Sequence, residues 1–310
     1  MGSMQPAAQA YLNGQWIDAS HAAIPVWDAG LVLGTTISEQ LRSFGGKLFE
    51  LEKHLTRLTR SLRLVGIPLP EPAETIADIA TRLLAHNLAG LPTGTDLGLA
   101  ILVTPGPYGT LASGIPAGPT LCLHTYPLPY ALWARQYELG QALVVTKIRQ
   151  VPPECWPREI KCRSRMHYFL ADREAAGIEP GARALLVESN GEVSETTTSN
   201  VLAWIEGEGL ISPPADLILP GISLAVTREI ASELGLPCRE RPLSVDELLA
   251  ADEVLLTSTP YCLLPSSRIN GQKIGDGHPG PIFRQLLKAW NERTGIDIVT
   301  QAMRAIGPPA

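Results

Sequence analysis

Hydrophobic residues recur along the chain at two spacings, and the spacing predicts which segments are helices. Between Glu50 and Val65, leucines and a final valine recur every three or four residues, which is the period of an amphipathic helix. Residues 74–88 repeat this pattern. The other predicted helices are 168–176, which ends at Gly177, 224–234, which is closed by Gly235, and 281–293.

Shorter apolar or alternating segments predict strands. Residues 11–17 alternate around Asn13-Gly14, which is a typical hairpin turn. Two further segments, 182–188 and 201–205, flank an Asn190-Gly191 turn. The remaining predicted strands are 97–103, 120–124, 142–148 and 253–257. Helices and strands do not alternate strictly, so the sequence predicts an α+β fold rather than a doubly wound sheet.

A stretch rich in proline and aromatic residues, Tyr126-Pro127-Leu128-Pro129-Tyr130, interrupts both patterns. Because prolines stiffen a connection and end strands and helices, we predict an interdomain linker at 126–132. It joins an N-terminal α/β domain, 1–125, to a C-terminal domain, 133–310. The Pro/Gly-rich stretch 104–119 is too long for a hairpin turn, and loops of this length are often functional.

Composition narrows the class of protein. The chain has 310 residues, 45% apolar and 18% charged, which fits a folded protein with a large core. Its net charge of −6 argues against a nucleic-acid binder. No apolar run is long enough for a membrane span, and no signal peptide is predicted. Five cysteines without paired spacing predict reduced thiols in a cytoplasm. Met1-Gly2-Ser3 resembles an expression scar.

Several common catalytic motifs are absent from the sequence. It contains no Gly-x-x-x-x-Gly-Lys-Ser/Thr loop, no Gly-x-Gly-x-x-Gly after a predicted strand and no Gly-x-Ser-x-Gly elbow. The six histidines lack the spacing of metal ligands or of a catalytic triad. We therefore predict no metal site.

Lys161 is one of only six lysines, and it lies between a proline-rich bend and a predicted helix. Arg158, Arg163 and Arg165 surround it in the sequence. Nearby positive charge disfavours the ammonium form and lowers the pKa of a lysine. A lysine that is neutral near pH 7 can form a Schiff base with a carbonyl. The same pattern is also typical of a solvated basic patch.

Four other segments add to this candidate. Glu195-Thr-Thr-Thr-Ser-Asn200 either caps a turn or supplies a carboxylate that keeps a pyridine nitrogen protonated. Residues 219–223 immediately precede a predicted helix, whose first N–H groups can cradle a phosphate. Residues 257–259 offer hydroxyl donors at the end of a strand. Arg57 is placed on a helix and can pair bidentately with a phosphate.

In this order, the motifs resemble the class IV (fold type IV) pyridoxal-phosphate family. That family includes branched-chain and D-amino acid aminotransferases, (R)-selective amine transaminases and 4-amino-4-deoxychorismate lyase. The resemblance extends from about Tyr11 to Thr294. The segments that carry it are Leu12–Gly14, Asp28–Gly30, Glu39–Arg42, His54–Leu58, Ile160-Lys161, Glu174-Ala175, Glu195–Asn200, Leu219–Ser223, Ala251–Glu253 and Thr257–Thr259.

The resemblance implies a two-domain enzyme that uses pyridoxal 5′-phosphate (PLP) and forms a homodimer. Lys161 would hold PLP as an internal aldimine and would then move a proton between Cα and C4′. Glu195 would pair with the pyridine nitrogen. The other implied cofactor-binding residues are Arg57, Gly221, Ile222, Ser223, Ser258 and Thr259.

The sequence departs from the family where substrates are selected. Ser38 replaces a usual aromatic residue, so we expect a smaller or more polar pocket wall. The loop at 104–109 lacks the Arg-x-His pair with which D-amino acid aminotransferases bind a carboxylate. Arg42 and Arg165 are alternative carboxylate ligands, and each is equally a candidate for a surface or interface salt bridge. Tyr108 and Pro260 complete the predicted substrate residues.

We expect a transaminase that moves an amino group between a small amine or amino acid and a 2-keto acid. The alternative within the fold is a lyase that releases pyruvate from aminodeoxychorismate. A binding protein that kept the fold and lost catalysis is the alternative from another class, and the presence of Lys161, Glu195 and Arg57 argues against it.

Overall fold

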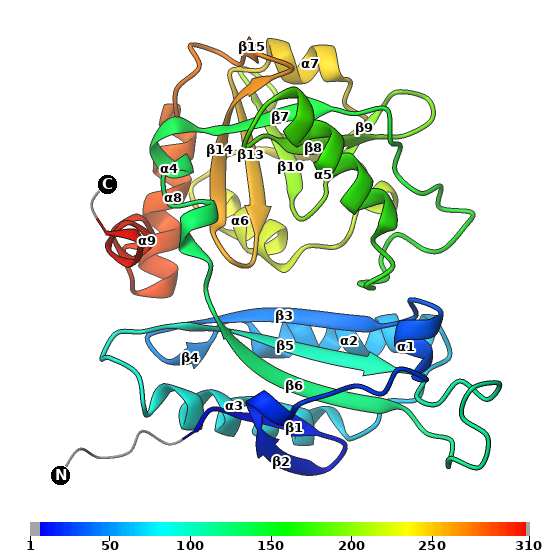
Figure 1. Cartoon of the computed structure of the whole chain (residues 1–310). Coiled ribbons are helices and arrows are strands. Elements are labelled where there is room, and N and C mark those ends of the chain that lie inside the picture. The colour runs from blue at the N-terminus through cyan, green and yellow to red at the C-terminus, as the bar shows by residue number, and fades with distance from the viewer. Residues whose placement is uncertain (1–6, 308–310) are drawn as a thin grey trace. The chain divides into compact units, whose positions relative to one another are not determined.

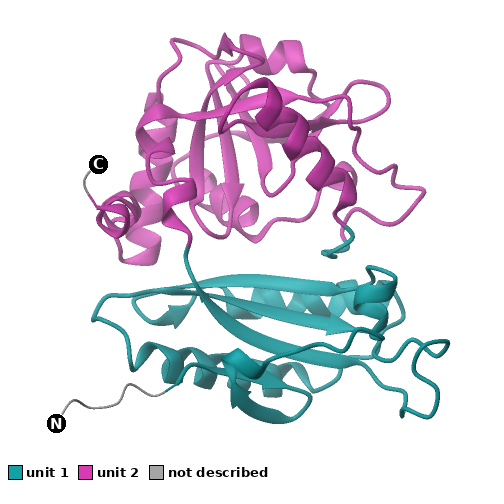
Figure 2. Cartoon of the chain, in the orientation of Figure 1, with its two compact units in different colours: residues 1–128, 160–164 teal, residues 129–159, 165–310 magenta. Residues whose placement is uncertain are grey.

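The computed structural model describes residues 7–307 (Figure 1), so the predicted expression scar at Met1-Gly2-Ser3 lies outside the described residues. The chain divides into two compact units, coloured separately in Figure 2. Unit 1 contains the chain up to Leu128 and the segment Ile160–Ser164, and unit 2 contains Pro129–Glu159 and the chain from Arg165 onward. The chain crosses between the units within the predicted linker. It also returns to unit 1 around Lys161, in a segment that the sequence placed in the second domain.

Unit 1 is an antiparallel sheet with helices against it. Its strands lie in the order β2-β1-β6-β5-β3-β4, and α2 (Leu51–Leu64) and α3 (Ala73–Leu88) pack on the sheet. The strands are β1 (Gln9–Leu12), β2 (Gln15–Asp18), β3 (Ile37–Phe44), β4 (Lys47–Leu48), β5 (Leu97–Thr104) and β6 (Thr120–Pro127), and a short helix, α1 (Ala29–Val32), precedes β3.

The local sequence explains these elements. Asn13 and Gly14 both have positive φ angles, 47° and 86°, as a two-residue hairpin turn between β1 and β2 requires. The leucines of α2 bury one face of the helix against the sheet. That buried face also carries two polar residues, His54 and Arg57. The predicted hairpin, both helices and strands β5 and β6 of this unit are confirmed.

Unit 2 contains a ring of strands. The path β10-β13-β14-β7-β8-β9 closes because β9 also pairs with β10, and β11 and β12 extend the sheet beyond β10. The strands are β7 (Gln141–Val145), β8 (Arg183–Val187), β9 (Val193–Thr196), β10 (Asn200–Ile205), β11 (Gly209–Ser212), β12 (Cys238–Glu240), β13 (Glu253–Ser258), β14 (Cys262–Ile269) and β15 (Gln272–Lys273). The longer helices are α5 (Met166–Ile178), α6 (Ile222–Glu233), α8 (Pro281–Thr294) and α9 (Ile298–Ile306), and the short ones are α4 (Gln136–Leu139) and α7 (Val245–Ala250).

The mixture of helices with largely antiparallel strands confirms the predicted α+β class. Seven strands of the described chain were missed, and the two longest of them are β3 and β14. β3 is buried on both faces although it contains Glu39 and Arg42, so it has no apolar alternation to detect. β14 contains Pro265 and still lies between two other strands, a position that usually excludes proline. The predicted helix at 168–176 is longer in the structure and passes through Gly177.

Within residues 7–307, every helix is too short or too polar to cross a bilayer.

Candidate active site

Lys161 lies on an extended segment that runs beside the start of β3 in unit 1. The Ser38 N–H donates to the Lys161 carbonyl at 2.9 Å, and the Arg163 N–H donates to the Thr36 carbonyl at 2.8 Å. On the helix side, the Lys161 N–H donates to Ser61 Oγ at 3.3 Å. Three contacts from β3 and α2 therefore fix the backbone on which the Lys161 side chain is carried.

The arginines around Lys161 in the sequence differ in their environment. Arg158 makes a buried ion pair with Glu188 in unit 2, with Nη2–Oε distances of 2.7 and 2.8 Å. Its guanidinium is therefore paired with a carboxylate of unit 2. The Arg165 guanidinium lies 5.9 Å from the centre of the Tyr168 ring, also in unit 2. The predicted effect of these arginines on the pKa of Lys161 stays a prediction.

Unit 1 contains a buried charged cluster, the Glu39 centre, formed by Glu39, His54 and Arg57. Arg57 Nε and Nη2 donate to the two Glu39 oxygens, each at 2.7 Å, and His54 Nδ1 lies 2.8 Å from Glu39 Oε2. Burial alone would raise the pKa of Glu39, but the Arg57 charge and the hydrogen bonds hold it well below its usual range. Burial lowers the pKa of His54, with Glu39 opposing that effect.

The Glu39 centre fixes the orientation of Arg57. A guanidinium has five N–H donors in a rigid plane, and the paired carboxylate of Glu39 uses two of them. Arg57 is thus held by β3 through Glu39 as well as by its own helix. Its predicted contact with a phosphate stays a prediction.

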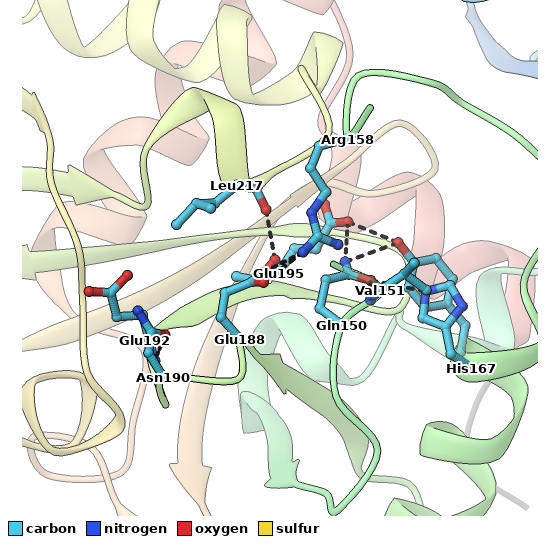
Figure 3. A network of polar contacts seen from close by, with 11 residues as sticks. Gln150, Val151, Arg158, His167, Glu188, Asn190, Glu192, Glu195 and Leu217 are labelled. Carbon is cyan, nitrogen blue, oxygen red and sulfur yellow. Dashed lines mark hydrogen bonds and ion pairs between the residues drawn. The ribbon is translucent and has the colours of Figure 1, made fainter. Parts of the chain in front are cut away.

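Unit 2 contains a second buried carboxylate, Glu195, at the end of β9. Gln150 Nε2 and the Tyr168 hydroxyl donate to its Oε1 at 3.0 and 2.9 Å. Asn200 Nδ2 and the Leu219 N–H lie 3.4 and 3.3 Å from its Oε2. These residues form the Glu195 centre, of which Figure 3 labels Glu195 and Gln150. Each of these four donors is neutral, and hydrogen bonds of this kind favour the ionised form of a carboxylate.

The Tyr168 hydroxyl keeps its proton. Burial, and then the neighbouring Glu195 charge, raise the pKa of Tyr168 far above its ordinary value. The hydroxyl therefore carries a proton at neutral pH and donates it to Glu195. Tyr168 lies on α5, seven residues after Lys161 in the chain.

The strand register places Glu195 in a row of polar residues. Glu195 is paired with Asn200 across β9 and β10, and Asn200 is paired with Thr257 across β10 and β13. Directly opposed residues share a face of the sheet, so the three side chains lie on one face. Among the described residues, Thr257 Oγ1 is buried without a hydrogen-bond partner. Such an atom is expected where a ligand supplies the missing partner.

The sequence left open whether residues 195–200 cap a turn or supply a carboxylate, and the turn between β9 and β10 shows which residues form the cap. The Thr196 N–H donates to the Ser199 carbonyl at 2.9 Å, and the Ser199 N–H donates to Thr196 Oγ1 at 3.0 Å. The hydroxyl residues therefore cap the turn. Glu195 lies before the turn, on β9.

The row ends at the start of α6. Gly221 is the N-cap of this helix, and a Cβ at this position would lie 2.0 Å from Asn200 Oδ1. Asn200 Nδ2 donates to the Leu219 carbonyl at 2.9 Å and so holds the segment before the helix. As a glycine, Gly221 has no side chain to accept from the first-turn N–H groups of Ile222 and Ser223. These N–H groups and the helix dipole suit an anion.

The polar arrangement in unit 2 therefore has two ends. A buried carboxylate at Glu195 suits a protonated ring nitrogen, and the helix start at Ile222 suits a phosphate. Asn200 contacts both ends. Nearby, Ser258 Oγ donates to the Thr198 carbonyl at 2.8 Å, so its proton is already used within the protein. Thr259 and Pro260 follow and are partly exposed.

The predicted substrate residues fall in both units. Unit 1 contains Ser38, Arg42 and Tyr108, and unit 2 contains Arg165 and Pro260. Ser38 is fully buried, and its hydroxyl has no hydrogen-bond partner among the described residues. Arg42 is also fully buried, so it is not a surface residue. Its guanidinium lies 4.0 Å from the centre of the Phe44 ring.

Sequence reasoning missed several of these contacts. Gln150 and Tyr168 contribute to the Glu195 centre, and Glu39 and His54 hold Arg57. Thr257 was predicted only as a hydroxyl donor at the end of a strand, and its place in the row follows from the register of β9, β10 and β13. Gln150 and Tyr168 have ordinary sequence contexts and carry no signal of their own. Among residues 7–307, no group of three or more His, Cys, Asp or Glu side chains is placed to hold a metal ion.

Comparison with known proteins gives consistent matches over most of the chain. Residues 36–269 match the protein family described as amino-transferase class IV. A D-alanine aminotransferase of Staphylococcus epidermidis is 29% identical over 288 residues, which cover 91% of this chain and 96% of the relative. A protein of Methanocaldococcus jannaschii named as a putative branched-chain-amino-acid aminotransferase is 28% identical over 286 residues, covering 91% and 95%.

Solved structures show the same fold. The branched-chain amino acid aminotransferase of Escherichia coli superposes with a TM-score of 0.83 at 22% identity and covers 93% of this chain and 94% of that one. A T.th. branched-chain amino acid aminotransferase, solved with pyridoxamine 5′-phosphate, gives a TM-score of 0.82 at 22% identity and covers 94% and 95%. These similarities confirm the predicted fold type IV.

Proposed function

The chain belongs to the class IV aminotransferases and is a PLP-dependent enzyme, and we propose that Lys161 carries the cofactor while Glu195 and the start of α6 bind its two polar ends. The observation that carries this proposal is the polar row of unit 2. It leads from the buried carboxylate of Glu195, through Asn200, to the open helix start at Gly221. PLP has a ring nitrogen and, on a side arm of the same ring, a phosphate, and these residues suit both groups.

Each residue then has a defined task. When bound, PLP supplies an electron sink for the bonds of the substrate Cα. Glu195 holds a proton on the ring nitrogen, which keeps that sink effective. Lys161 would hold PLP through its Nζ amine, and this amine would then move a proton between the substrate Cα and C4′. Because β3 and α2 fix the backbone of Lys161, only its side chain has to move when the amine moves the proton.

The phosphate would be bound by backbone N–H groups and by side chains. We propose that the N–H groups of Ile222 and Ser223 and the hydroxyl of Thr259 donate to it, with Gly221 allowing close approach. Arg57, whose guanidinium Glu39 holds in one orientation, would donate as well. Ser258 would contribute through its backbone position, because its hydroxyl is bonded to Thr198.

We propose that the substrates are a small amine or amino acid and a 2-keto acid. The relatives described above are named for D-alanine and for branched-chain amino acids, which are small. The buried hydroxyl of Ser38 and the side chains of Tyr108 and Pro260 would line the pocket. Arg42 and Arg165 are the candidates for the substrate carboxylate.

We further propose that the enzyme acts as a cytoplasmic homodimer. Its five cysteines are all free thiols, as expected in a reducing compartment. Unit 1 exposes Val26, Leu31, Leu33 and Leu111, each more than half accessible, and exposed apolar side chains in such number favour burial against a second copy.

A half-reaction tests the proposed function. Purified protein loaded with PLP is mixed with an amino donor alone, and its visible absorbance and the keto acid product are followed. A transaminase loses the visible band, releases one keto acid per site and regains the band when a 2-keto acid is added. Repeated release of pyruvate from aminodeoxychorismate without an acceptor would instead indicate the lyase. A spectrum that no donor changes would contradict both.

A further inference from the structure

Gln150 lies between the carboxylate of the Glu195 centre and a histidine. Its Oε1 accepts from the Val151 N–H at 3.0 Å and lies 3.0 Å from His167 Nε2. Its Nε2 donates to Glu195 Oε1 at 3.0 Å. Figure 3 shows this chain of contacts, with the Arg158–Glu188 ion pair close by. The amide therefore joins His167 to Glu195.

The direction of every hydrogen bond in this chain is determined by chemistry. A backbone N–H can only donate, so the atom that faces Val151 must be the amide oxygen. An ionised carboxylate can only accept, so the atom that faces Glu195 must be the amide nitrogen. The Gln150 oxygen cannot donate to His167. His167 must therefore carry its proton on Nε2.

The surroundings of His167 keep its ring neutral. The ring is partly buried against Tyr168, and the two ring centres are 4.1 Å apart. The centre of the Trp156 ring lies 6.4 Å from that of His167. Arg158 and Arg165 add positive charge nearby. Burial and then these two charges lower the pKa of His167 to about 4. The one N–H of the neutral ring then donates to Gln150 Oε1.

We propose that His167 and Gln150 are positioning residues for the PLP-dependent reaction: His167 holds the Gln150 amide in one orientation, and the amide holds the Glu195 carboxylate ionised and aimed at the ring nitrogen. This inference rests on the proposed function, because it takes Glu195 as the partner of that nitrogen. It adds two residues that contact neither the cofactor nor the substrate. Both act through Glu195.

This relay, from His167 through Gln150 to Glu195, is tested by a double-mutant cycle with Gln150→Leu and His167→Phe. PLP affinity is measured by titrating the apo-protein and following tryptophan fluorescence. Each single variant should bind PLP about tenfold more weakly, the scale of one hydrogen bond to a charged group. The double variant should be no weaker than Gln150→Leu, because residues that act through one contact are not additive. Gln272→Leu, at an exposed glutamine, is the matched control and should bind normally.

Conservative replacement distinguishes positioning from packing. His167→Gln keeps an N–H that can donate to Gln150 and should retain most of the affinity, whereas His167→Phe keeps the ring and loses the donor. The pH midpoint of the bound cofactor's absorbance should move by about one unit in Gln150→Leu and remain near the wild-type value in His167→Gln. Additive losses, an unmoved midpoint or equal losses in both His167 variants would overturn the relay.

A measurement without cofactor separates this inference from the proposed function. In the apo-protein, nitrogen NMR of His167 should show a neutral ring with the proton on Nε2 above about pH 5, given a pKa of about 4. A proton on Nδ1 would overturn the relay whatever the protein binds. Wild-type protein that bound no PLP would instead contradict the proposed function, even with the expected NMR signal.

Discussion

Glu39 and Glu195 are both buried carboxylates, one in each unit, and they are held in different ways. Glu39 is paired with the full positive charge of Arg57 through two bonds of 2.7 Å. Glu195 accepts hydrogen bonds from Gln150, Tyr168 and Asn200, which are neutral donors. In the first centre the charge is compensated by a neighbouring residue. In the second, neutral donors stabilise the anion, and its proposed partner is the cationic ring nitrogen of PLP.

We expect this difference to give the two carboxylates different roles. A carboxylate that is already paired with an arginine has little electrostatic effect on a ligand, but it orients that arginine well. A buried carboxylate that is stabilised by neutral donors can act strongly on a cationic ligand. Glu39 should therefore matter most for stability, and Glu195 most for turnover.

Glu39→Gln should have the largest effect, and it should be on stability. The substitution leaves the Arg57 charge buried without its carboxylate, which typically costs about 3–5 kcal/mol of unfolding free energy. Urea unfolding at pH 7 measures this cost, with Glu52→Gln on the exposed side of α2 as the control. A loss below about 1 kcal/mol would be in the range of a surface pair and would contradict the account.

Glu195→Gln should reverse that pattern. We expect the amino-transfer rate to fall by about 100- to 1,000-fold, the scale on which enzymes lose rate when a group that stabilises developing charge is removed. The unfolding free energy should change much less than in Glu39→Gln, because the neutral amide has no charge to leave unpaired. Steady-state kinetics measure the effect, and Glu206→Gln, at an exposed position of the same unit, is the control. Near-normal turnover would contradict the role of Glu195.

Gly221→Ala should have an intermediate effect on cofactor binding. The added Cβ would lie 2.0 Å from Asn200 Oδ1, so either Asn200 or the start of α6 must move. We expect PLP to bind about tenfold more weakly, as for the loss of one hydrogen bond to a charged group. Gly177→Ala is the control, because a Cβ there meets no atom within 4 Å. Equal PLP affinities for both variants would argue against a phosphate at this helix start.

Acid should weaken the fold through His54 and His167 and then through Glu39. The pKa values of His54 and Glu39 are lowered by folding, and that of His167 is lowered to about 4. The unfolded chain therefore binds these protons more readily, and stability is lost as the pH falls below about 6.5 for the histidines and below about 4.3 for Glu39. In His167→Gln, the unfolding free energy should depend less steeply on pH between about pH 6.5 and pH 4 than in wild type. An unchanged slope would contradict a neutral His167.

The elements with clear periodicity were predictable from the sequence, and so was the order of the motifs. α2 and α3 bury one apolar face each, and this face gives a helical repeat. β3 was not predictable in this way, because Glu39 is buried by pairing with residues of α2 rather than by being apolar. Pro265 concealed β14 for a different reason, since proline rarely occupies a strand with neighbours on both sides.

The sequence proposes candidates for the site but does not show how distant strands meet. Lys161 and Glu195 were predicted as partners of the cofactor from the order of the motifs, and these roles stay proposals. Gln150 and Thr257 reach the Glu195 row only through the closed ring of β-strands, in which β9 pairs with β10. The return of residues 160–164 to unit 1 depends on backbone bonds to β3 and leaves no pattern in the sequence.

Borohydride reduction followed by peptide mapping tests the central claim most directly. Protein loaded with PLP is reduced, digested and analysed by mass spectrometry, with Lys161→Ala treated in parallel. We predict a single phosphopyridoxyl adduct, on Lys161, and none in Lys161→Ala. A reducible adduct that maps to another lysine, or that persists in Lys161→Ala, would contradict the account.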